Sequence, residues 1–90
     1  MKTVVIGVGS GAGMDTIMAV YPRHKALVDA SVERGEIIGI GPFLDRSGSL
    51  AIFRNREAAE AFVKKDPFIL EGLIKSYEIH EWGDQMLPAS

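Results

Sequence analysis

Four short segments of the chain have the composition and spacing of β-strands, and each is bounded by turn residues. The middle two are separated by Gly41-Pro42 and by Asp45-Arg46-Ser47-Gly48, so we expect them to form a hairpin with a long turn. In the last segment the side chains alternate, with Tyr77 and Ile79 on one face and Ser76, Glu78, His80 and Trp82 on the other. The predicted strands are Thr3 to Val8, Glu36 to Ile40, Leu50 to Phe53 and Ile74 to Trp82.

Two other segments have the apolar spacing of helices. The first lies between the first two strands, where Pro22 is acceptable only in a first helical turn, so a helix is predicted from about Tyr21 to Gly35. The second runs from Arg56 to Lys65 and is followed by a short turn from Pro67 to Glu71. The apolar stripes are Val20, His24, Leu27, Val28 and Val32 in the first helix and Ala59, Phe62 and Val63 in the second, which Asp66 extends by one turn.

The order βαββαβ predicts an α+β protein with the ferredoxin-like arrangement and a four-stranded antiparallel sheet. Ninety residues allow one domain, 1–90, of which 83–90 form a short tail that is either disordered or lying on a partner. Val4 and Ile6 alternate with Val5, so both sheet faces are apolar, whereas two helices can cover only one. The sequence therefore predicts a homodimer with facing sheets.

Charge and composition exclude several classes of partner. Ten basic and twelve acidic residues give a net charge of -2, which provides no electrostatic footprint for nucleic acid or an anionic membrane. The absence of cysteine excludes disulfides, thiolate metal sites and a thiol nucleophile, and fits a cytoplasmic protein. The apolar run from Val4 to Gly13 is too short to span a bilayer and lacks the features of a signal peptide, so we expect a soluble, unprocessed chain.

The glycine-rich segment from Gly7 to Ala12 fits the phosphate-binding pattern G-x-G-x-x-A after a strand. A dinucleotide fold needs more strands than this chain holds, and the next acidic residue after a strand, Asp45, lies far beyond the expected spacing of about 20 residues. We therefore interpret this segment as a flexible connection, which could act as a lid beside a cleft, and predict no cofactor.

His24 and Asp66 are the candidate catalytic residues, because both occupy positions where the periodicity calls for an apolar side chain. Each also has a purely structural interpretation: a core histidine bonded to a carbonyl group, and an N-cap for the turn that begins at Pro67. If the helices pack side by side, the carboxylate would orient the imidazole as a general base or acid. A nucleophilic serine (Ser10, Ser47 or Ser49) would need an arrangement that the sequence cannot show, and His24 and His80 lack the clustered spacing of a metal site.

An ordered set of motifs between about Val4 and Trp82 resembles the YCII-related, or YciI-like, proteins of the dimeric α+β barrel superfamily. The motifs are Pro22-x-His24, Gly41-Pro42, Gly48-Ser49-Leu50, Glu57-Ala58-Ala59, Asp66-Pro67-Phe68, Gly72-Leu73 and Glu78-Ile79 through Trp82. The resemblance implies a ferredoxin-like fold, a homodimer with facing sheets and a His24–Asp66 active-site pair. Similar proteins include a dehydrochlorinase acting on a chlorinated hydroxyquinol, and the wider superfamily contains muconolactone isomerase, which implies proton transfer on ring-derived substrates.

This chain differs from the family pattern at three places. Tyr21 stands where an arginine is common, Lys25 stands where a leucine is common, and the glycine-rich loop lengthens the first connection. These differences bear on the charge of the substrate more than on the fold. Around the pair, candidate substrate-binding residues forming an apolar pocket with one hydroxyl group are Pro42, Phe43, Ser49, Phe68 and Trp82, each of which could equally be ordinary core.

Three functional hypotheses follow. The first is a small lyase- or isomerase-like enzyme in which His24 moves a proton and Asp66 orients it, acting on a small ring-derived or lactone substrate without cofactor. The second is a module that binds a small molecule or a second protein without changing it. The third is a structural homodimer in which His24 and Asp66 simply satisfy each other.

Overall fold

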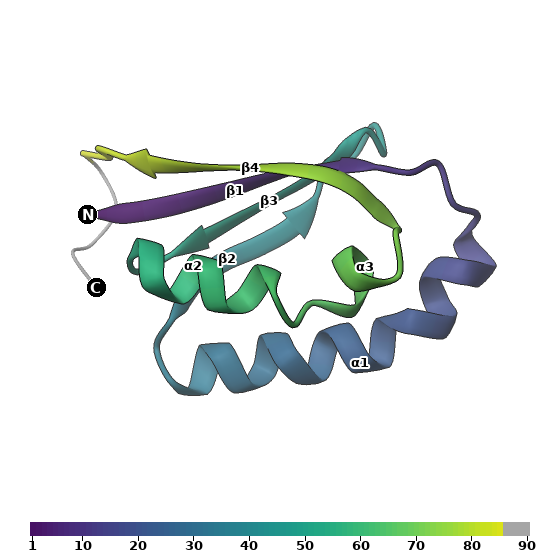
Figure 1. Cartoon of the computed structure of the whole chain (residues 1–90), viewed down its shortest axis with the longest axis horizontal. Helices are drawn as coiled ribbons and strands as arrows, with labels where there is room; N and C mark the ends of the chain where they lie inside the picture. The colour runs from purple at the N-terminus through teal and green to yellow at the C-terminus, as the bar shows by residue number, and fades with distance from the viewer. Residues whose placement is uncertain (86–90) are drawn as a thin grey trace.

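A computed structural model describes residues 1–85, so most of the predicted tail, residues 86–90, lies outside the described part. The order of elements is βαββααβ, in which the third helix is a single short turn after the second (Figure 1). The elements are β1 (Lys2–Gly9), α1 (Met14–Glu33), β2 (Ile37–Pro42), β3 (Gly48–Phe53), α2 (Arg56–Val63), α3 (Pro67–Leu70) and β4 (Ile74–Trp82).

The strands form one sheet in the order β2-β3-β1-β4, and every neighbouring pair is antiparallel. This is the predicted ferredoxin-like α+β fold. Residues opposite each other in a ladder point to the same face, so Val5 shares a face with Ala51 and Ile79. The opposite face carries Ile6 and its partner Leu50.

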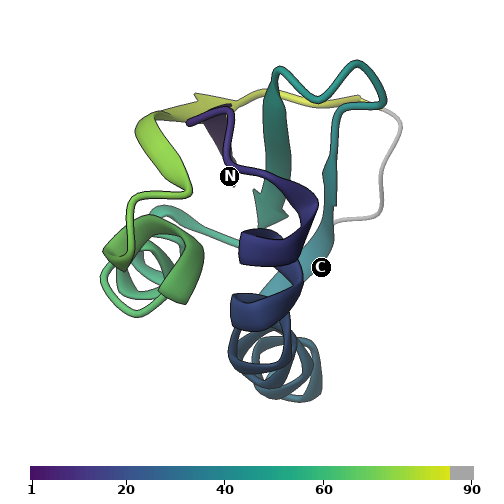
Figure 2. The same cartoon turned by 90° about the vertical axis from the view of Figure 1, so that its right-hand side faces the viewer.

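All three helices lie on the same side of the sheet, as Figure 2 shows in end view. The core forms between the sheet and the helices, where Phe53 and Ala59 have no exposed surface. The ring of Phe53 packs against that of Phe62 from α2, with ring centroids 5.2 Å apart. Apolar residues at helical spacing on α2 thus fill the space above the alternating apolar residues of β1 and β3.

The start of α1 differs from the prediction of a helix beginning near Tyr21. The helix begins seven residues earlier, at Met14, with Gly13 as N-cap and Pro22 inside it. Proline removes the bond to the carbonyl group of Met18 and kinks the helix. Both Pro22 and Met18 face solvent, so water can satisfy that carbonyl group, and the start of α1 is inclined to the rest of the helix (Figure 1).

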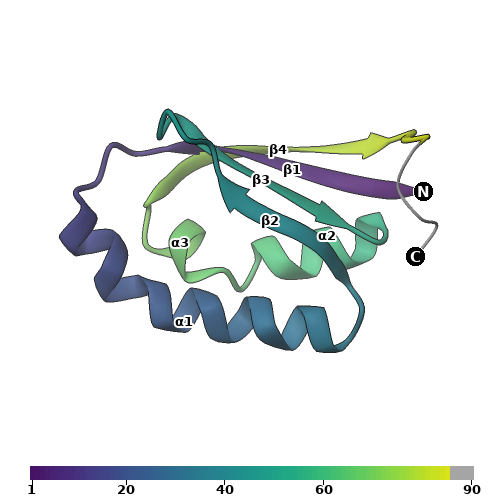
Figure 3. The same cartoon turned by 180° about the vertical axis from the view of Figure 1, so that it is seen from behind.

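In the described part of the chain, no helix lies on the second face of the sheet (Figure 3). Its centre is apolar and partly exposed, with Val8 and Ile38 each 40% exposed. Along the β4 edge the same face is polar, because Glu78 and His80 stand opposite Ile6 and Val4. We call this surface the open face; its outward apolar side chains on β1, β2 and β3 are Val4, Ile6, Val8, Ile38, Leu50 and Ile52. Within residues 1–85, no helix is long and apolar enough to cross a membrane.

Candidate active site

His24 lies in the middle of α1, on the side that faces the sheet. It belongs to the inner stripe of the helix, together with Val20 and Ser31, and is only 9% exposed. Three or four residues separate successive members of such a stripe, so a polar side chain at this spacing is carried into the interior by the helix itself.

Asp66 reaches His24 from the N-terminus of α3. Its Oδ1 atom lies 2.8 Å from Nδ1 of His24 and 3.1 Å from the backbone nitrogen of Phe68, and the residue is 2% exposed. An ionised carboxylate only accepts hydrogen bonds, so Nδ1 of His24 is the donor. Pro67 follows at the first helical position, as expected for this cap. One oxygen atom of Asp66 therefore accepts the hydrogen bond of the cap and also contacts the imidazole of His24.

Aromatic rings enclose the imidazole of His24. The Phe68 ring stacks on it, with centroids 4.2 Å apart and planes 17° apart. Phe62 presents its edge at 6.4 Å, and Tyr21, one helical turn earlier, lies at 6.1 Å. These rings shield the faces of the imidazole from water, so a substrate can reach His24 only at the edge of its ring.

The second ring nitrogen of His24, Nε2, has no hydrogen-bond partner among residues 1–85. It is also not fully enclosed, because the one fully buried side-chain polar atom without a partner in this part of the chain is Oγ1 of Thr3. With Nδ1 protonated and held by Asp66, Nε2 of the neutral ring carries a free lone pair. The pair thus presents a proton acceptor at a partly open, largely apolar position.

An ion pair beside the site joins α1 and α3, the two helices that carry His24 and Asp66. Arg23, next to His24 on α1, bonds Glu71, the C-cap of α3. This contact raises the pKa of Arg23, first through the hydrogen bond and then through the charge of Glu71. Because both side chains are exposed, we expect the pair to help align α1 with α3 and to contribute little to stability.

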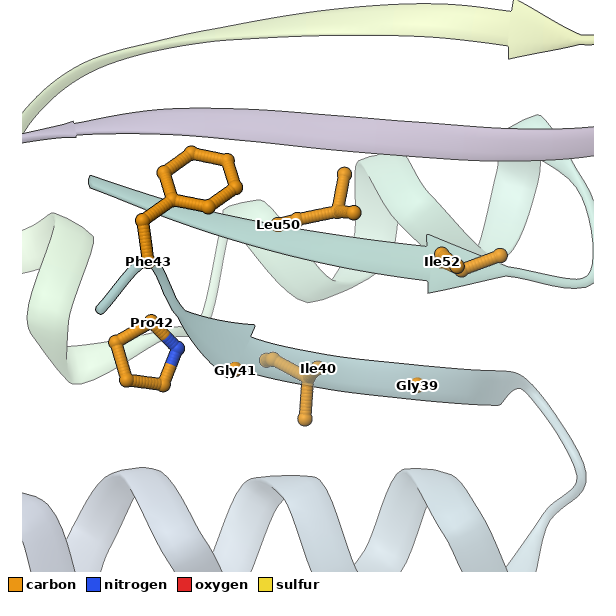
Figure 4. Close-up of a pocket in the computed structure, with 7 residues that line it drawn as sticks. All are labelled: Gly39, Ile40, Gly41, Pro42, Phe43, Leu50 and Ile52. Atoms are coloured by element: carbon orange, nitrogen blue, oxygen red, sulfur yellow. The ribbon is translucent and has the colours of Figure 1, made fainter. Parts of the chain in front are cut away.

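The predicted substrate-binding residues do not form a single pocket around His24. Phe68 contacts His24 directly, and Ser49 stands opposite Gly7 on the helix-covered side of the sheet. Pro42 and Phe43 instead line a separate hollow of about 280 Å³ over β2 and β3, where the Phe43 ring lies next to Leu50 (Figure 4). The hollow is lined by Gly39, Ile40, Gly41, Pro42, Phe43, Leu50 and Ile52.

Trp82 is not brought to His24 within one chain. It pairs with Lys2 at the far end of the β1–β4 ladder and belongs to the open face, whereas the site is on the helix-covered face. Tyr21 is not among the predicted substrate-binding residues, yet its ring centroid lies 6.1 Å from that of His24. The signal for it was its spacing three residues before His24, which places both side chains on one side of a helix.

No group of three or more His, Cys, Asp or Glu residues within residues 1–85 could hold a metal ion. The site described here consists of a histidine, a carboxylate and apolar rings. Such a set can accept, hold and return a proton.

Comparison with known proteins identifies the family of this chain and supports its fold. The family model of the YCII-related domain matches residues 1–83. Among solved structures, a similar one is 5-chloro-2-hydroxyhydroquinone dehydrochlorinase (TftG) from Burkholderia phenoliruptrix AC1100 in complex with 2,5-dihydroxybenzoquinone. It has a TM-score of 0.76 and 21% sequence identity, over 94% of this chain and 96% of that chain, and therefore supports the fold.

A second solved structure, the structural-genomics protein YJCS, has a TM-score of 0.48 and 16% identity, over 91% of this chain and 96% of that one. No curated protein is significantly similar in sequence.

Proposed function

This chain belongs to the YCII-related family, and from that premise we propose that it is a small lyase- or isomerase-like enzyme using His24 and Asp66 for general acid–base chemistry. The observation that carries the proposal is the 2.8 Å contact between Nδ1 of His24 and Oδ1 of Asp66. Because this contact engages Nδ1, Nε2 of His24 is left as the atom that can accept a proton from a substrate. The similar solved structure is named a dehydrochlorinase, which supports a small ring-derived substrate such as a chlorinated, hydroxylated quinol.

In the proposed reaction, Nε2 of His24 removes a proton from the substrate. The released electron pair moves into the ring system; in an elimination, chloride then departs with its bonding pair, and in an isomerisation the imidazolium returns the proton at another atom. Asp66 holds the ring in position and stabilises the imidazolium charge, as carboxylates do beside catalytic histidines. Phe68 covers one face of the imidazole, which strengthens that electrostatic interaction by excluding water.

Replacing His24 by Gln tests this proposal, because glutamine occupies a similar volume but cannot carry a proton. With 5-chloro-2-hydroxyhydroquinone as the first test substrate, chloride release should fall by at least about 100-fold, the smaller end of what a positioned acid–base group contributes. His80→Gln is the matched control, since that histidine lies on the opposite sheet face from His24.

Thermal melts would show whether both variants remain folded. Equal chloride release by native protein and His24→Gln would contradict the proposal. Native protein that binds the quinol but releases no chloride would favour the non-catalytic binding module.

A homodimer with facing sheets is the second part of the proposal, and the open face is the observation that favours it. Partly exposed apolar residues cover three adjacent strands there, and no helix within residues 1–85 shields them. Monomeric proteins rarely expose contiguous apolar patches of this kind. Light scattering at micromolar concentration should give twice the mass of one chain, and a mass of one chain would contradict the dimer. A purely structural dimer would show the doubled mass without any turnover.

A further inference from the structure

A second cavity, of about 180 Å³, lies where the end of β1, the start of α1, the β2–β3 turn and the start of β4 meet. In Figure 1 these segments gather at the right-hand end of the molecule. Its walls are mainly apolar or backbone, and one of its side chains is charged. The lining residues are Gly9, Ser10, Gly11, Ala12, Ile17, Arg46 and Leu73.

Backbone hydrogen bonds fix the segments around this cavity. Gly9 donates to the carbonyl group of Ser47 and Ser10 donates to that of Leu73, each at 2.9 Å. Arg46 has a φ of 66° and donates its own N–H to Phe43, also at 2.9 Å. The β1–α1 connection, predicted from sequence to be flexible, is thus bonded to two other segments.

Arg46 is the charged side chain of the cavity, and within residues 1–85 it has no carboxylate partner. Its neighbour Asp45 instead accepts hydrogen bonds from the backbone and hydroxyl groups of Ser47, at 2.9 and 2.6 Å. Lys2, Arg23, Lys25, Arg34 and Arg56 are paired with acids, whereas Lys64, Lys65 and Lys75, which like Arg46 have no acidic partner among residues 1–85, do not line the cavity. An unpaired guanidinium beside an apolar cavity is suited to a ligand with an ionised oxygen.

The cavity is aligned with His24 through α1. Ile17, which lines it, is seven residues before His24 on α1, and the buried Val20 lies between them in the sequence. At 1.5 Å per residue, seven residues correspond to about 10 Å along the helix axis. A ring-sized molecule anchored at Arg46 could therefore extend toward His24.

We propose that Arg46 is a specificity-determining residue that binds an ionised oxygen of the substrate, a carboxylate or an acidic ring hydroxyl, while the apolar part extends along α1 toward His24. This inference rests on the proposed function and names the substrate class: small ring compounds that are anions at neutral pH. The apolar lining by Ile17 and Leu73 favours a ring over a strongly hydrated anion, and a bidentate guanidinium contact provides the charge recognition.

The experiment is an NMR titration of ¹⁵N-labelled protein with sodium benzoate, with benzyl alcohol as the neutral analogue and trans-cinnamate as the longer acid. Benzoate should shift the amide signals of residues 9–12 and 46, and benzyl alcohol should not. Cinnamate, whose ring lies farther from its carboxylate, should also shift the side-chain signals of His24. In Arg46→Gln the benzoate affinity should fall by at least about tenfold, the effect of losing a charged hydrogen bond.

Lys64→Gln is the matched control, because Lys64 is an exposed cation at the C-cap of α2 that does not line the cavity. It should bind benzoate as the native protein does. The inference is overturned if benzoate leaves residues 9–12 and 46 unshifted, if Arg46→Gln binds it as tightly as native protein, or if cinnamate never reaches His24. Chloride release that depends on His24 would survive those outcomes, so failure of this inference is distinguishable from failure of the proposed function.

Discussion

At the scale of single residues, one oxygen atom of Asp66 connects local structure with chemistry. It caps α3 through Phe68 and accepts the hydrogen bond of His24. Both roles follow from the position of an aspartate directly before Pro67, which can be identified in the sequence. The partner cannot be identified that way, because 42 residues separate His24 from Asp66 and only the packing of α1 against α3 joins them.

We expect Asp66→Ala to lower the free energy of unfolding by about 2 kcal/mol or more, because it removes a cap and leaves a buried imidazole N–H without a partner. Urea denaturation would measure the loss. Asp66→Asn should cost less, since asparagine is also a good N-cap. Asp29→Ala, which removes an exposed carboxylate on α1, is the control. A cost for Asp66→Ala as small as that for Asp29→Ala would mean that the pair contributes nothing to the fold.

At the scale of elements, the strands could be predicted closely from alternation, and β4 has the expected limits, Ile74–Trp82. The start of α1 could not be predicted in this way, because the local rule for proline places Pro22 in a first helical turn, whereas it lies inside the helix. Because Pro22 and Met18 are exposed, water can replace the hydrogen bond that proline removes. Exposure depends on tertiary packing, which local sequence rules do not contain. The separation of the predicted pocket residues could not be predicted either, since Phe68 stacks on His24 whereas Pro42 and Phe43 line a different hollow.

The hairpin between β2 and β3 depends on Gly48. A methyl group there would lie 1.9 Å from the carbonyl oxygen of Gly7, which is backbone and cannot move aside without opening the β1–β3 ladder. Gly48→Ala should therefore lower the free energy of unfolding by about 3 kcal/mol or more, because of the steric clash. Gly83→Ala, where an added methyl group meets nothing within 4 Å, should be close to neutral in the same urea denaturation. Similar urea midpoints for the two variants would contradict the close contact between Gly48 and the backbone of β1.

The turn of this hairpin should also respond to acid. Hydrogen bonds from the hydroxyl and backbone groups of Ser47 lower the pKa of Asp45. Because the pKa is depressed in the folded state, the stabilisation is complete above the ordinary value of about 4 and is lost as the pH falls through the folded-state pKa. A ¹³C NMR titration of Asp45 should show a lowered pKa that returns toward its ordinary value in Ser47→Ala. An identical titration in both proteins would exclude the turn as the cause.

At the scale of the whole molecule, helices cover one sheet face and leave the open face exposed, as alternation of apolar residues along β1 and β3 already implied. If two copies pack through this face, a charge placed there should separate them. We expect Val8→Asp, at a residue 40% exposed, to give the mass of one chain in light scattering. Val32→Asp, at a residue 57% exposed on α1, should keep the mass of two. The facing-sheet arrangement would be contradicted if Val8→Asp kept the doubled mass or if Val32→Asp lost it.

The central claim is that Asp66 fixes the proton of His24 on Nδ1 and leaves Nε2 free to accept another. Side-chain ¹⁵N NMR at about pH 9, where a histidine is ordinarily uncharged, reports which nitrogen carries the proton. His80 is an internal reference, since its Nε2, rather than Nδ1, lies 3.4 Å from Glu78. We predict that His24 is protonated on Nδ1 in the native protein and loses this preference in Asp66→Ala. Protonation of His24 on Nε2 in the native protein would contradict the account, because the proposed acceptor would then already carry its proton.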